Sequence, residues 1–400
     1  MPKTVGVAVS NATFHFDKLY TYAVLPEHED QVRLGSMVLV PFGRGSRARM
    51  GVVLACDAEP PHSKLKVLFD VAPASACLTP ELLRLVHFLK ERTFCTYYEA
   101  VKAVIPYGAQ YKPTVAEDGV TPVLQKPRPT AKQLAAVALL GGGPRTQGEL
   151  EEKGVSRAVL DNLCAKGVLE CTKVNRSIDL YANIPLKQEP IVLTSEQQLA
   201  YKALLPKLED DAPHSALLYG VTGSGKTLVF LKLIERCLQL GRKALVLVPE
   251  ISLTPQMILR LKRQFGKRVA VQHSALNHTE RLLQWQMIQD GGADIVVGTR
   301  SAIFSPLEHI GLVIIDEEQE HTYRSESSPR YSAHEVARQR AGENGALLLL
   351  ASATPSTESY YAARQGRTQL VKLTQRYGGN PLPSVPLGHM RAALAGGNPR

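Results

Sequence analysis

The feature that most constrains this 400-residue chain is an eight-residue loop at 220–227 with the sequence GVTGSGKT. It follows an apolar run at Ser215–Tyr219 and precedes a helix-like segment at Leu228–Leu240, the strand–loop–helix setting of a phosphate-binding loop. Glycines allow backbone N–H groups to turn inward around phosphates, and the following helix adds its dipole. The pattern predicts a nucleoside triphosphate site; the alternative is an ordinary Gly-rich turn.

The polar side chains of this loop have expected roles. Lys226 would neutralise phosphate oxygens, and Thr227 would offer its hydroxyl to Mg²⁺. Ahead of the loop, Gln197 carries an amide that could recognise an adenine edge. The expected nucleotide contacts are Gln197, Gly220, Thr222, Gly223, Ser224, Gly225, Lys226 and Thr227.

Acidic residues follow an apolar strand candidate, Leu312–Ile315, which runs directly into Asp316-Glu317-Glu318-Gln319. The carboxyl ends of strands are where α/β sheets bind ligands. Asp316 is suited to holding Mg²⁺ through water, and Glu317 to orienting and deprotonating an attacking water. Acids are also common in plain strand-to-helix turns. The phosphate loop upstream favours a hydrolytic site, with Glu317 and Lys226 as catalytic residues.

Strands alternate with helices from Ile191 onward, which predicts a parallel α/β sheet. The strand candidates are continuously apolar, as buried parallel strands are. They are Ala216–Tyr219, Ala244–Val248, Val269–Gln272, Ile295–Gly298, Leu312–Ile315 and Leu347–Ser352.

Three further polar stretches fall at strand ends, at 249–256 (PEISLTPQ), 298–302 (GTRSA) and 352–355 (SATP). Their amides, hydroxyls and one arginine would share one edge of the sheet and could grip a sugar-phosphate backbone without reading bases. Thr254, Gln256, Thr299 and Arg300 are the candidate DNA contacts. Taken singly, each stretch could be a generic loop.

The first half of the chain has a different composition. Residues 1–56 are β-rich, with strand candidates at Val5–Val9, Tyr20–Val24, Met37–Val40 and Met50–Cys56, and residues 79–105 have helical spacing. A proline-bearing stretch at 112–129 indicates a linker. The order helix, helix, helix, strand over 130–176 is typical of a winged helix, which could touch DNA or act only as a spacer.

The net charge of +10 makes a polyanionic partner plausible, although a solvated basic surface would give the same value. The six cysteines form no C-x-x-C pair, which argues against a zinc site or a disulfide framework. No apolar run approaches the ~20 residues that span a bilayer, and no signal-peptide core follows Met1. We expect a cytoplasmic protein without membrane insertion.

These segments, in this order, resemble the first motor lobe of a superfamily 2 helicase. Several segments are similar in sequence to the PriA family (primosomal protein N′): GVTGSGKT, VPEISLTPQ, HSALN, GTRSAIF and IDEE, together with VPFG at 40–43. The resemblance implies an ATP-dependent 3′-to-5′ DNA helicase, with ATP and Mg²⁺ as cofactors, that recognises stalled or branched forks and restarts replication through primosome assembly. It implies forked and single-stranded DNA as partners, with single-strand-binding and primosome or helicase-loading proteins.

The resemblance also implies a pocket for a DNA 3′ end in the N-terminal region. The pocket maps onto Tyr20-Thr21-Tyr22, Gly43 and Lys66, with Thr21 where the family has Asp. Discrimination of the terminal 3′-OH should therefore be weaker, unless Asp17 substitutes. The alternative for both tyrosines is an ordinary core-facing role.

A second departure is Gln319, at a position where the family usually has His and where nucleotide state is coupled to DNA binding. The family's aromatic-rich, DNA-sensing loop would follow, with Arg330 and Tyr331 as cationic and stacking candidates. Ordinary loop residues are the alternative. The departure therefore puts coupling in doubt, whereas hydrolysis through Glu317 need not be affected.

The sequence reaches Arg400, about where a second motor lobe would begin. The resemblance places an arginine finger in that lobe and a zinc module downstream, so we expect this chain alone to bind ATP and DNA but to hydrolyse slowly. The alternative is a non-catalytic fork-binding module with regulatory ATP binding. The expected fold class is multidomain α/β. The expected divisions are 1–108 (β-rich 3′-end-binding), 109–129 (linker), 130–176 (winged helix), 190–375 (RecA-like lobe) and 376–400 (linker).

Overall fold

The computed structural model describes the two parts of the chain that carry these motifs. The described residues are 3–10, 12–43, 46–58, 65–72, 77–105, 156, 159, 190–250 and 255–377. The chain divides into two compact units, and all described residues except Ser156 and Val159 belong to the unit of residues 1–113 and 178–400. Apart from those two residues, the predicted winged helix lies outside the described residues, as do the linker at 109–129 and residues 378–400.

The N-terminal part is a six-stranded sheet in the order β5-β2-β1-β4-β3-β6, antiparallel except for the parallel pair of β2 and β5. Its strands are β1 (Thr4–Val9), β2 (Tyr20–Ala23), β3 (Met37–Phe42), β4 (Arg47–Cys56), β5 (Lys66–Val67) and β6 (Asp70–Val71). The four strands predicted over 1–56 are confirmed. Valines of β1, β3 and β4 form an apolar core, because β-branched side chains pack well on a pleated surface.

Two helices follow this sheet, α1 (Pro80–Arg92) and α2 (Tyr97–Val104). The Thr79 hydroxyl accepts from the backbone N–H of Leu82, and Thr96 forms a capping box with Glu99. The predicted helical spacing over 79–105 is confirmed. The segment forms two helices and not one, because Thr96 caps the start of a second helix after the first ends at Arg92.

The C-terminal part is a seven-stranded parallel sheet in the order β13-β7-β12-β11-β8-β10-β9. Its strands are β7 (His214–Gly220), β8 (Lys243–Leu247), β9 (Val269–Gln272), β10 (Ile295–Gly298), β11 (Ile310–Ile315), β12 (Leu347–Ser352) and β13 (Gln369–Leu373). All six strands predicted in this region are confirmed. The edge strand β13 was not predicted.

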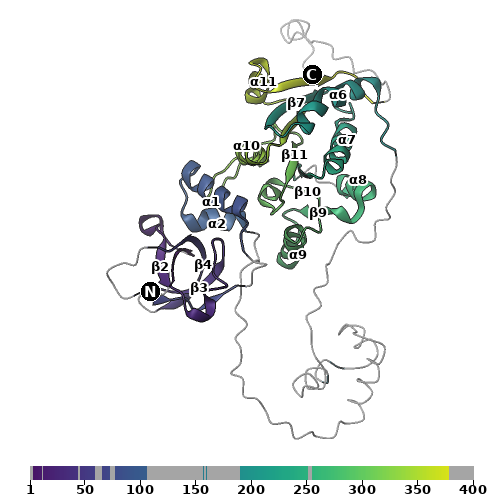
Figure 1. Cartoon of the computed structure of the whole chain (residues 1–400). Helices are drawn as coiled ribbons and strands as arrows, with labels where there is room; N and C mark the ends of the chain where they lie inside the picture. Colours follow the sequence, from purple (N-terminus) through teal and green to yellow (C-terminus); the bar gives the residue numbers. More distant parts are fainter. Residues whose placement is uncertain are drawn as a thin grey trace, which may run out of the picture. The chain divides into compact units, whose positions relative to one another are not determined.

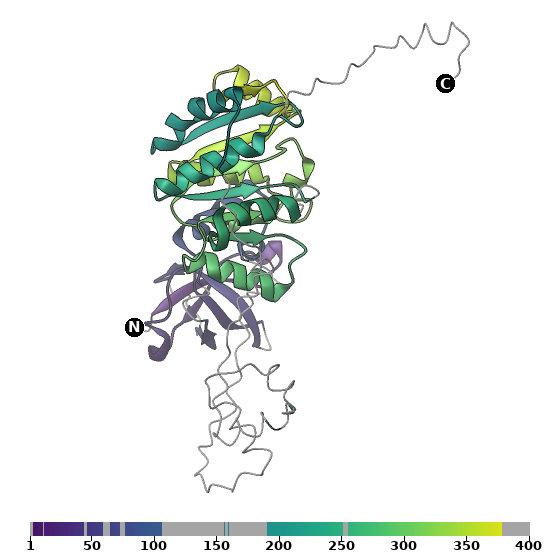
Figure 2. The ribbon, with the colours of Figure 1, turned by 90° about the vertical axis from the view of Figure 1, so that its right-hand side faces the viewer.

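Helices cover both faces of this sheet, as Figures 1 and 2 show. Side chains of α6, α7 and α8 share one apolar core with one face of the strands, and those of α9, α10 and α11 pack on the other. The helices are α6 (Ser195–Glu209), α7 (Lys226–Gln239), α8 (Pro255–Phe265), α9 (His278–Gln289), α10 (Ala333–Asn344) and α11 (Thr357–Arg364). Short 3₁₀ helices are η1 (Phe14–Phe16), η2 (Pro26–His28), η4 (Gly266–Arg268), η5 (Arg300–Phe304) and η6 (His321–Tyr323). Within the described residues, no helix is long and apolar enough to cross a membrane.

Helices α1 and α2 join the N-terminal sheet to the parallel-sheet lobe through one apolar core. Next to this core, the fully buried Arg340 of α10 donates from Nε to Glu81 Oε1 of α1 at 2.8 Å. Asn344 Nδ2 donates to the same oxygen at 3.0 Å. Further along, Gln289 Nε2 of α9 donates to the Cys77 carbonyl at 3.0 Å. Helix α1 and Cys77 are thereby packed directly on the lobe.

Candidate nucleotide and DNA site

The phosphate loop joins the end of β7 to the start of α7. Gly223 and Gly225 both have positive φ, at 80° and 76°, and Gly225 is the N-cap of α7. Only glycine adopts this conformation at little cost. A Cβ on Gly225 would also lie 2.4 Å from Gln197 Nε2, and one on Gly220 would lie 2.6 Å from Ser224 Oγ. The glycines are therefore required by both backbone conformation and close packing.

The predicted catalytic and metal-binding residues meet around one cavity of about 400 Å³. Lys226 Nζ donates to the Gly220 carbonyl at 3.1 Å and lies 3.8 Å from Glu317 Oε1. The cavity is lined by Thr222, Gly223, Ser224, Gly225, Lys226, Thr227, Leu228, Arg260, Asp316, Glu317 and Tyr377. Residues 90 positions apart in the sequence thus share one site, because β7 and β11 both end at the same edge of the sheet.

Two residues of this cavity were missed by sequence reasoning. Arg260 comes from the exposed side of α8, where nothing in the local pattern separates it from other surface cations. Tyr377 follows β13, and its backbone N–H donates to the Gly223 carbonyl at 2.8 Å. An aromatic residue just beyond the last strand was the only available signal for it.

The carboxyl group of Asp316 is buried beside a second acid. Burial, and then the neighbouring Glu317, raise the pKa of Asp316 to about 6, against the opposing effect of Lys226. Its Oδ1 accepts the backbone N–H of Glu317 at 3.0 Å, and its own carbonyl accepts the Tyr323 hydroxyl at 2.6 Å. Burial also raises the pKa of Tyr323, so its hydroxyl remains a donor. A bound divalent cation would offset the electrostatic repulsion between the Asp316 and Glu317 carboxylates.

Gln319 connects the two loops at the ends of β11 and β12. Its Nε2 donates to Glu317 Oε2 at 3.1 Å, and its Oε1 accepts the Ser352 hydroxyl at 2.6 Å. Ser352 Oγ in turn accepts the backbone N–H of Thr354 at 2.8 Å. The amide thus supplies both a donor and an acceptor between the acidic loop and the SATP stretch. Hydrogen bonds thus run without a break from Glu317 through Gln319 to Ser352 and Thr354. Whether this route couples nucleotide state to DNA binding stays a prediction.

Glu318 anchors the acidic loop to α11. Burial alone would raise the pKa of Glu318, but the nearby His334, whose Nε2 lies 3.5 Å from Oε2, and hydrogen bonds from Ser356 and Ser359 hold that pKa below its usual range. Ser356 donates from its backbone at 2.7 Å and Ser359 from its hydroxyl at 2.8 Å. This acid is therefore a structural tie and is not free for chemistry.

Gln197 is 1% exposed, and its amide is used within the protein. Its Oε1 accepts the backbone N–H of Thr194 in a capping box, and its Nε2 donates to the Ser224 carbonyl at 2.8 Å. In this arrangement the amide braces the phosphate loop. Recognition of an adenine edge stays a prediction.

The predicted DNA contacts of the lobe have different surroundings. Thr299 is buried, and Arg300 Nη1 donates to the carbonyls of Thr322 and Arg324. The guanidinium also lies over the Tyr331 ring, 5.8 Å from its centroid. Tyr331 is only 8% exposed and packs edge-on against Phe304, because the loop folds its ring inward. This geometry leaves no open ring face for a base.

Among the other lobe candidates, Arg330 is exposed. Thr254 lies outside the described residues, as does the side chain of Gln256 at the start of α8. Both stay predictions.

In the N-terminal sheet, two of the five predicted pocket positions are joined by a hydrogen bond. Lys66 Nζ donates to the Gly43 carbonyl at 2.8 Å. Tyr20 packs edge-on with Phe42 at 4.9 Å. Thr21 points to the opposite face of β2 from Tyr20, because side chains alternate along a strand.

Tyr22, the remaining pocket position, and Asp17, the possible substitute for the missing carboxylate, both have structural roles. Tyr22 is buried in the core, where its hydroxyl donates to the Pro41 carbonyl at 3.1 Å. Asp17 pairs with Lys90 at 2.6 Å and accepts the backbone N–H of Tyr97 at 2.9 Å. The suggestion that Asp17 replaces the missing carboxylate is therefore not supported by its contacts.

Known proteins share these features. Residues 194–362 match the family model described as DEAD/DEAH box helicase, and residues 5–106 match the 3′DNA-binding domain (3′BD). Replication restart protein PriA of Bacillus subtilis (strain 168) is 33% identical over 98% of this chain and 58% of the relative. That of Synechocystis sp. is 36% identical over 78% of this chain and 37% of the relative, and that of Haemophilus influenzae is 32% identical over 90% and 51%. The chain spans about half the length of the curated relatives it matches.

A parallel-sheet lobe with a phosphate loop facing a carboxylate pair, matched by the DEAD/DEAH-box model, defines a helicase ATP-binding lobe. Here it shares a chain and a core with a 3′DNA-binding domain. The chain thus carries one region matched by each of these two family models, and it is similar in sequence to the replication restart proteins PriA.

Proposed function

We propose that this chain is the DNA-binding and first motor-lobe portion of an ATP-dependent 3′-to-5′ DNA helicase that recognises stalled or branched replication forks and restarts replication. The supporting observation is the cavity that gathers Lys226, Thr227, Asp316 and Glu317 in a chain that also carries a 3′DNA-binding domain. The domain divisions expected from the sequence form part of this proposal.

The residues of the cavity suit ATP hydrolysis. Lys226 would stabilise negative charge on the phosphates, and the backbone N–H groups of the loop would cradle them. The Thr227 hydroxyl and Asp316 carboxylate are hard oxygen ligands of the kind Mg²⁺ prefers. The ion, when bound, would neutralise charge on the phosphate oxygens. Glu317 would orient the attacking water and accept its proton, while Gln319 holds the Glu317 side chain from behind.

The DNA side of the proposal rests on positioned cations and hydroxyls. In the N-terminal domain, Tyr20, Thr21, Gly43 and Lys66 would meet a DNA 3′ end. In the lobe, the candidates are Arg300, Arg330 and the 249–256 loop, with Thr299 and Tyr331 contributing through packing. Forked and single-stranded DNA are the proposed ligands. Single-strand-binding and helicase-loading proteins are the proposed partners, and the cytoplasm is the proposed location.

ATP turnover tests this function directly. We would measure hydrolysis by residues 1–400 with and without a fork that carries a 3′ leading-strand end. The expected result is slow turnover that the fork stimulates. Glu317→Gln should abolish the stimulated increment while ATP binding remains. Glu320→Gln is the matched control, because this acid of the same loop does not line the nucleotide cavity.

One result would contradict ATP hydrolysis by this chain. If ATP and the fork both bind but turnover never rises above that of Glu317→Gln, the chain is a fork-recognition module with regulatory nucleotide binding.

A further inference from the structure

Tyr377 is the one aromatic side chain among the described residues that line the nucleotide cavity. It is 54% exposed, and its ring contacts no ring or cation of another described residue. Aromatic side chains usually bury most of their surface against neighbours, and ligand pockets commonly use such rings to bind flat apolar groups. Within the described part of the chain, the ring of Tyr377 therefore has a free face at a ligand cavity.

The order of the strands places Tyr377 at the end of the cavity away from the acidic residues. Strand β13 pairs with one side of β7, whereas β11 lies beyond β12 on the other side. Leu373, at the end of β13, is the register partner of Gly220, the first residue of the phosphate loop. The proposed role of Glu317 places the terminal phosphate beside β11. The nucleoside end of the same ligand would then extend along the phosphate loop toward Tyr377.

The backbone that carries this ring is fixed at several points. The N–H of Tyr377 donates to the Gly223 carbonyl at 2.8 Å. Just before it, Glu196 of α6 accepts the backbone N–H and hydroxyl of Thr374 at 2.6 and 2.7 Å, and the backbone N–H of Gln375 at 3.1 Å. Burial alone would raise the pKa of Glu196, but these hydrogen bonds lower it, so they are charge-assisted at neutral pH. A ring on a fixed backbone loses little conformational freedom when a ligand binds.

The amide that could recognise a base edge is engaged within the protein. Gln197 Oε1 accepts the backbone N–H of Thr194, and Nε2 donates to the Ser224 carbonyl. A Cβ built on Gly225 would lie 2.4 Å from Gln197 Nε2 and 3.6 Å from Tyr377 Cβ, so both side chains flank this glycine. The Tyr377 ring therefore lies where a base is expected, and it can bind that base through its face without a hydrogen bond.

We propose that Tyr377 binds the base of the nucleotide by stacking its ring on the face of the base. The inference rests on the proposed nucleotide-binding function and names the residue that distinguishes a nucleotide from a bare polyphosphate. Every base has a π-face, so stacking adds affinity whichever base edge is presented. The phosphate loop and Lys226 would hold the phosphates separately, and the Tyr377 hydroxyl would not be needed.

Isothermal titration calorimetry of residues 1–400 with Mg²⁺-ADP and with Mg²⁺-pyrophosphate tests this assignment, because both ligands carry a diphosphate but only ADP carries a base. Tyr377→Ala should weaken ADP binding about tenfold, as the loss of one base–aromatic stack does. Pyrophosphate binding should not change, because the backbone N–H that donates to Gly223 remains in this variant. Tyr377→Phe keeps the ring and should bind ADP as tightly as the unaltered chain.

The matched control is Tyr361→Ala. Tyr361 of α11 is 59% exposed, close to the value for Tyr377, but it does not line the nucleotide cavity. Its loss should leave the affinity for both ligands unchanged. Tyr377→Leu serves as the second variant if circular dichroism shows that Tyr377→Ala does not fold. Because leucine keeps apolar bulk but has no aromatic face, this variant should also weaken ADP binding and leave pyrophosphate binding unchanged.

Three outcomes overturn the proposal and leave nucleotide binding standing. The first is unchanged ADP affinity in Tyr377→Ala. The second is an equal loss of ADP and pyrophosphate affinity in that variant, which would show that the side chain supports the phosphate loop and not the base. The third is an equal loss in Tyr377→Phe and Tyr377→Ala, which would assign the effect to the hydroxyl. Absence of ADP binding by the unaltered chain contradicts the proposed function itself.

Discussion

Asp316 links the stability of the fold to the metal-binding role that we propose for it. Because its pKa is raised to about 6 in the folded chain, the folded state binds a proton more readily than the unfolded state between about pH 4 and pH 6. Stability from this group is therefore fully present below pH 4 and is lost as the pH rises to 6. A shift of about two pKa units corresponds to about 3 kcal/mol.

Asp316→Asn should therefore raise the free energy of unfolding by up to about 3 kcal/mol at pH 8 and by much less at pH 4. The asparagine Oδ1 can still accept the backbone N–H of Glu317. The measurement is urea unfolding in EDTA at both pH values. Asp294→Asn, which removes a carboxylate paired with Arg268, should show no such gain. A gain of equal size at both pH values would contradict the assignment, and Mg²⁺-dependent ATP binding should fall in Asp316→Asn alone.

A comparison of Gly225 with Gly241 separates the cost of left-handed backbone strain from the cost of a steric clash with a neighbouring side chain. Their φ values are 76° and 73°, but only Gly225 has a neighbour where a Cβ would be, Gln197 Nε2 at 2.4 Å; at Gly241 nothing lies within 4 Å. Gly241→Ala should cost about 1 kcal/mol of left-handed strain. Gly225→Ala should cost about 1 kcal/mol more, because it displaces the Gln197 amide from the Ser224 carbonyl.

Thermal unfolding and nucleotide affinity measure this difference. Gly225→Ala should also weaken ATP binding, since the Gln197 amide braces the loop that holds the phosphates. Equal stability losses, with unchanged ATP affinity in both variants, would show that Gln197 has no such role.

At the scale of elements, α1 and α10 are joined by two ion pairs of very different surroundings. Arg340 is fully buried against Glu81, whereas Arg84 reaches Glu343 at 2.8 Å with more than half of its side chain exposed. Glu81→Gln should destabilise the chain by about 3 kcal/mol, because it leaves a buried cation without its counter-charge. Glu343→Gln, across the same interface, should change stability by about 0–1 kcal/mol. The measurement is the free energy of unfolding of both variants in urea. Similar losses of stability in the two variants would mean that the hydrogen bonds of Arg340 to backbone carbonyls are enough to stabilise its buried charge.

The elements that could be predicted from sequence are those whose own residues carry the signal. The six predicted strands of the parallel sheet are continuously apolar, and the phosphate loop and Asp316–Gln319 are short contiguous patterns. Strand β13 was missed because Gln369–Leu373 is only partly buried and owes its conformation to pairing with β7. Pairs such as Glu81 and Arg340, 259 residues apart, leave no local pattern.

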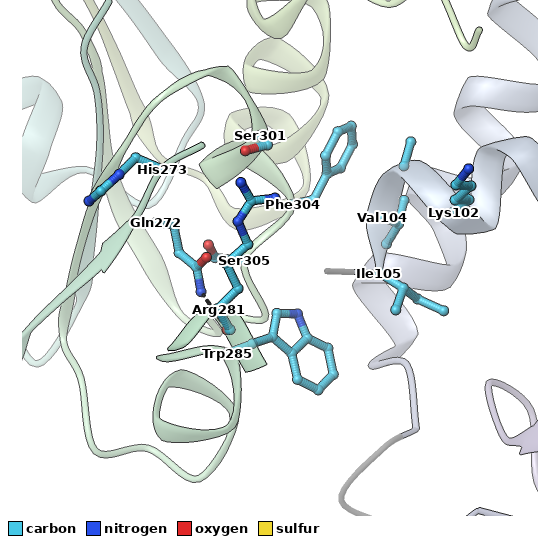
Figure 3. Close-up of a pocket in the computed structure, with 11 residues that line it drawn as sticks. Lys102, Val104, Ile105, Gln272, His273, Arg281, Trp285, Ser301, Phe304 and Ser305 are labelled. Carbon is cyan, nitrogen blue, oxygen red and sulfur yellow. Dashed lines mark hydrogen bonds between the residues drawn. The ribbon is translucent and has the colours of Figure 1, made fainter. Parts of the chain in front are cut away.

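Exposure was also not predictable from residue type. Tyr331 and Arg300 are types that commonly contact nucleic acid, yet the loop turns the Tyr331 ring inward and Arg300 donates to backbone carbonyls. The cavity of about 160 Å³ between the end of α2 and the loops after β9 and β10 (Figure 3) was not predictable for a related reason, since its lining residues Lys102, Arg281 and Ser301 come from three separate elements.

At the scale of the whole molecule, the N-terminal sheet and the parallel-sheet lobe share one apolar core through α1 and α2. Residues of α1 and α2, such as Leu85 and Val101, belong to the same buried cluster as Val336 of α10 and Ile315 of β11. Opening either part alone would expose this cluster to water, at about 25 cal/mol per Å² of apolar surface. The two parts should therefore unfold together.

Ligand linkage tests this cooperativity. The proposed site for Mg²⁺-ADP is the phosphate loop, so by mass action the ligand should stabilise only the structure that unfolds with that loop, by about 2.7 kcal/mol at a hundredfold excess over Kd. Native-state hydrogen exchange measures the effect amide by amide. The slowest amides of β4, in the N-terminal sheet, should gain the same protection as those of β12 in the lobe. A gain confined to β12 would show that the N-terminal sheet opens independently, and the shared core would then be too weak to transmit nucleotide binding to the 3′DNA-binding domain.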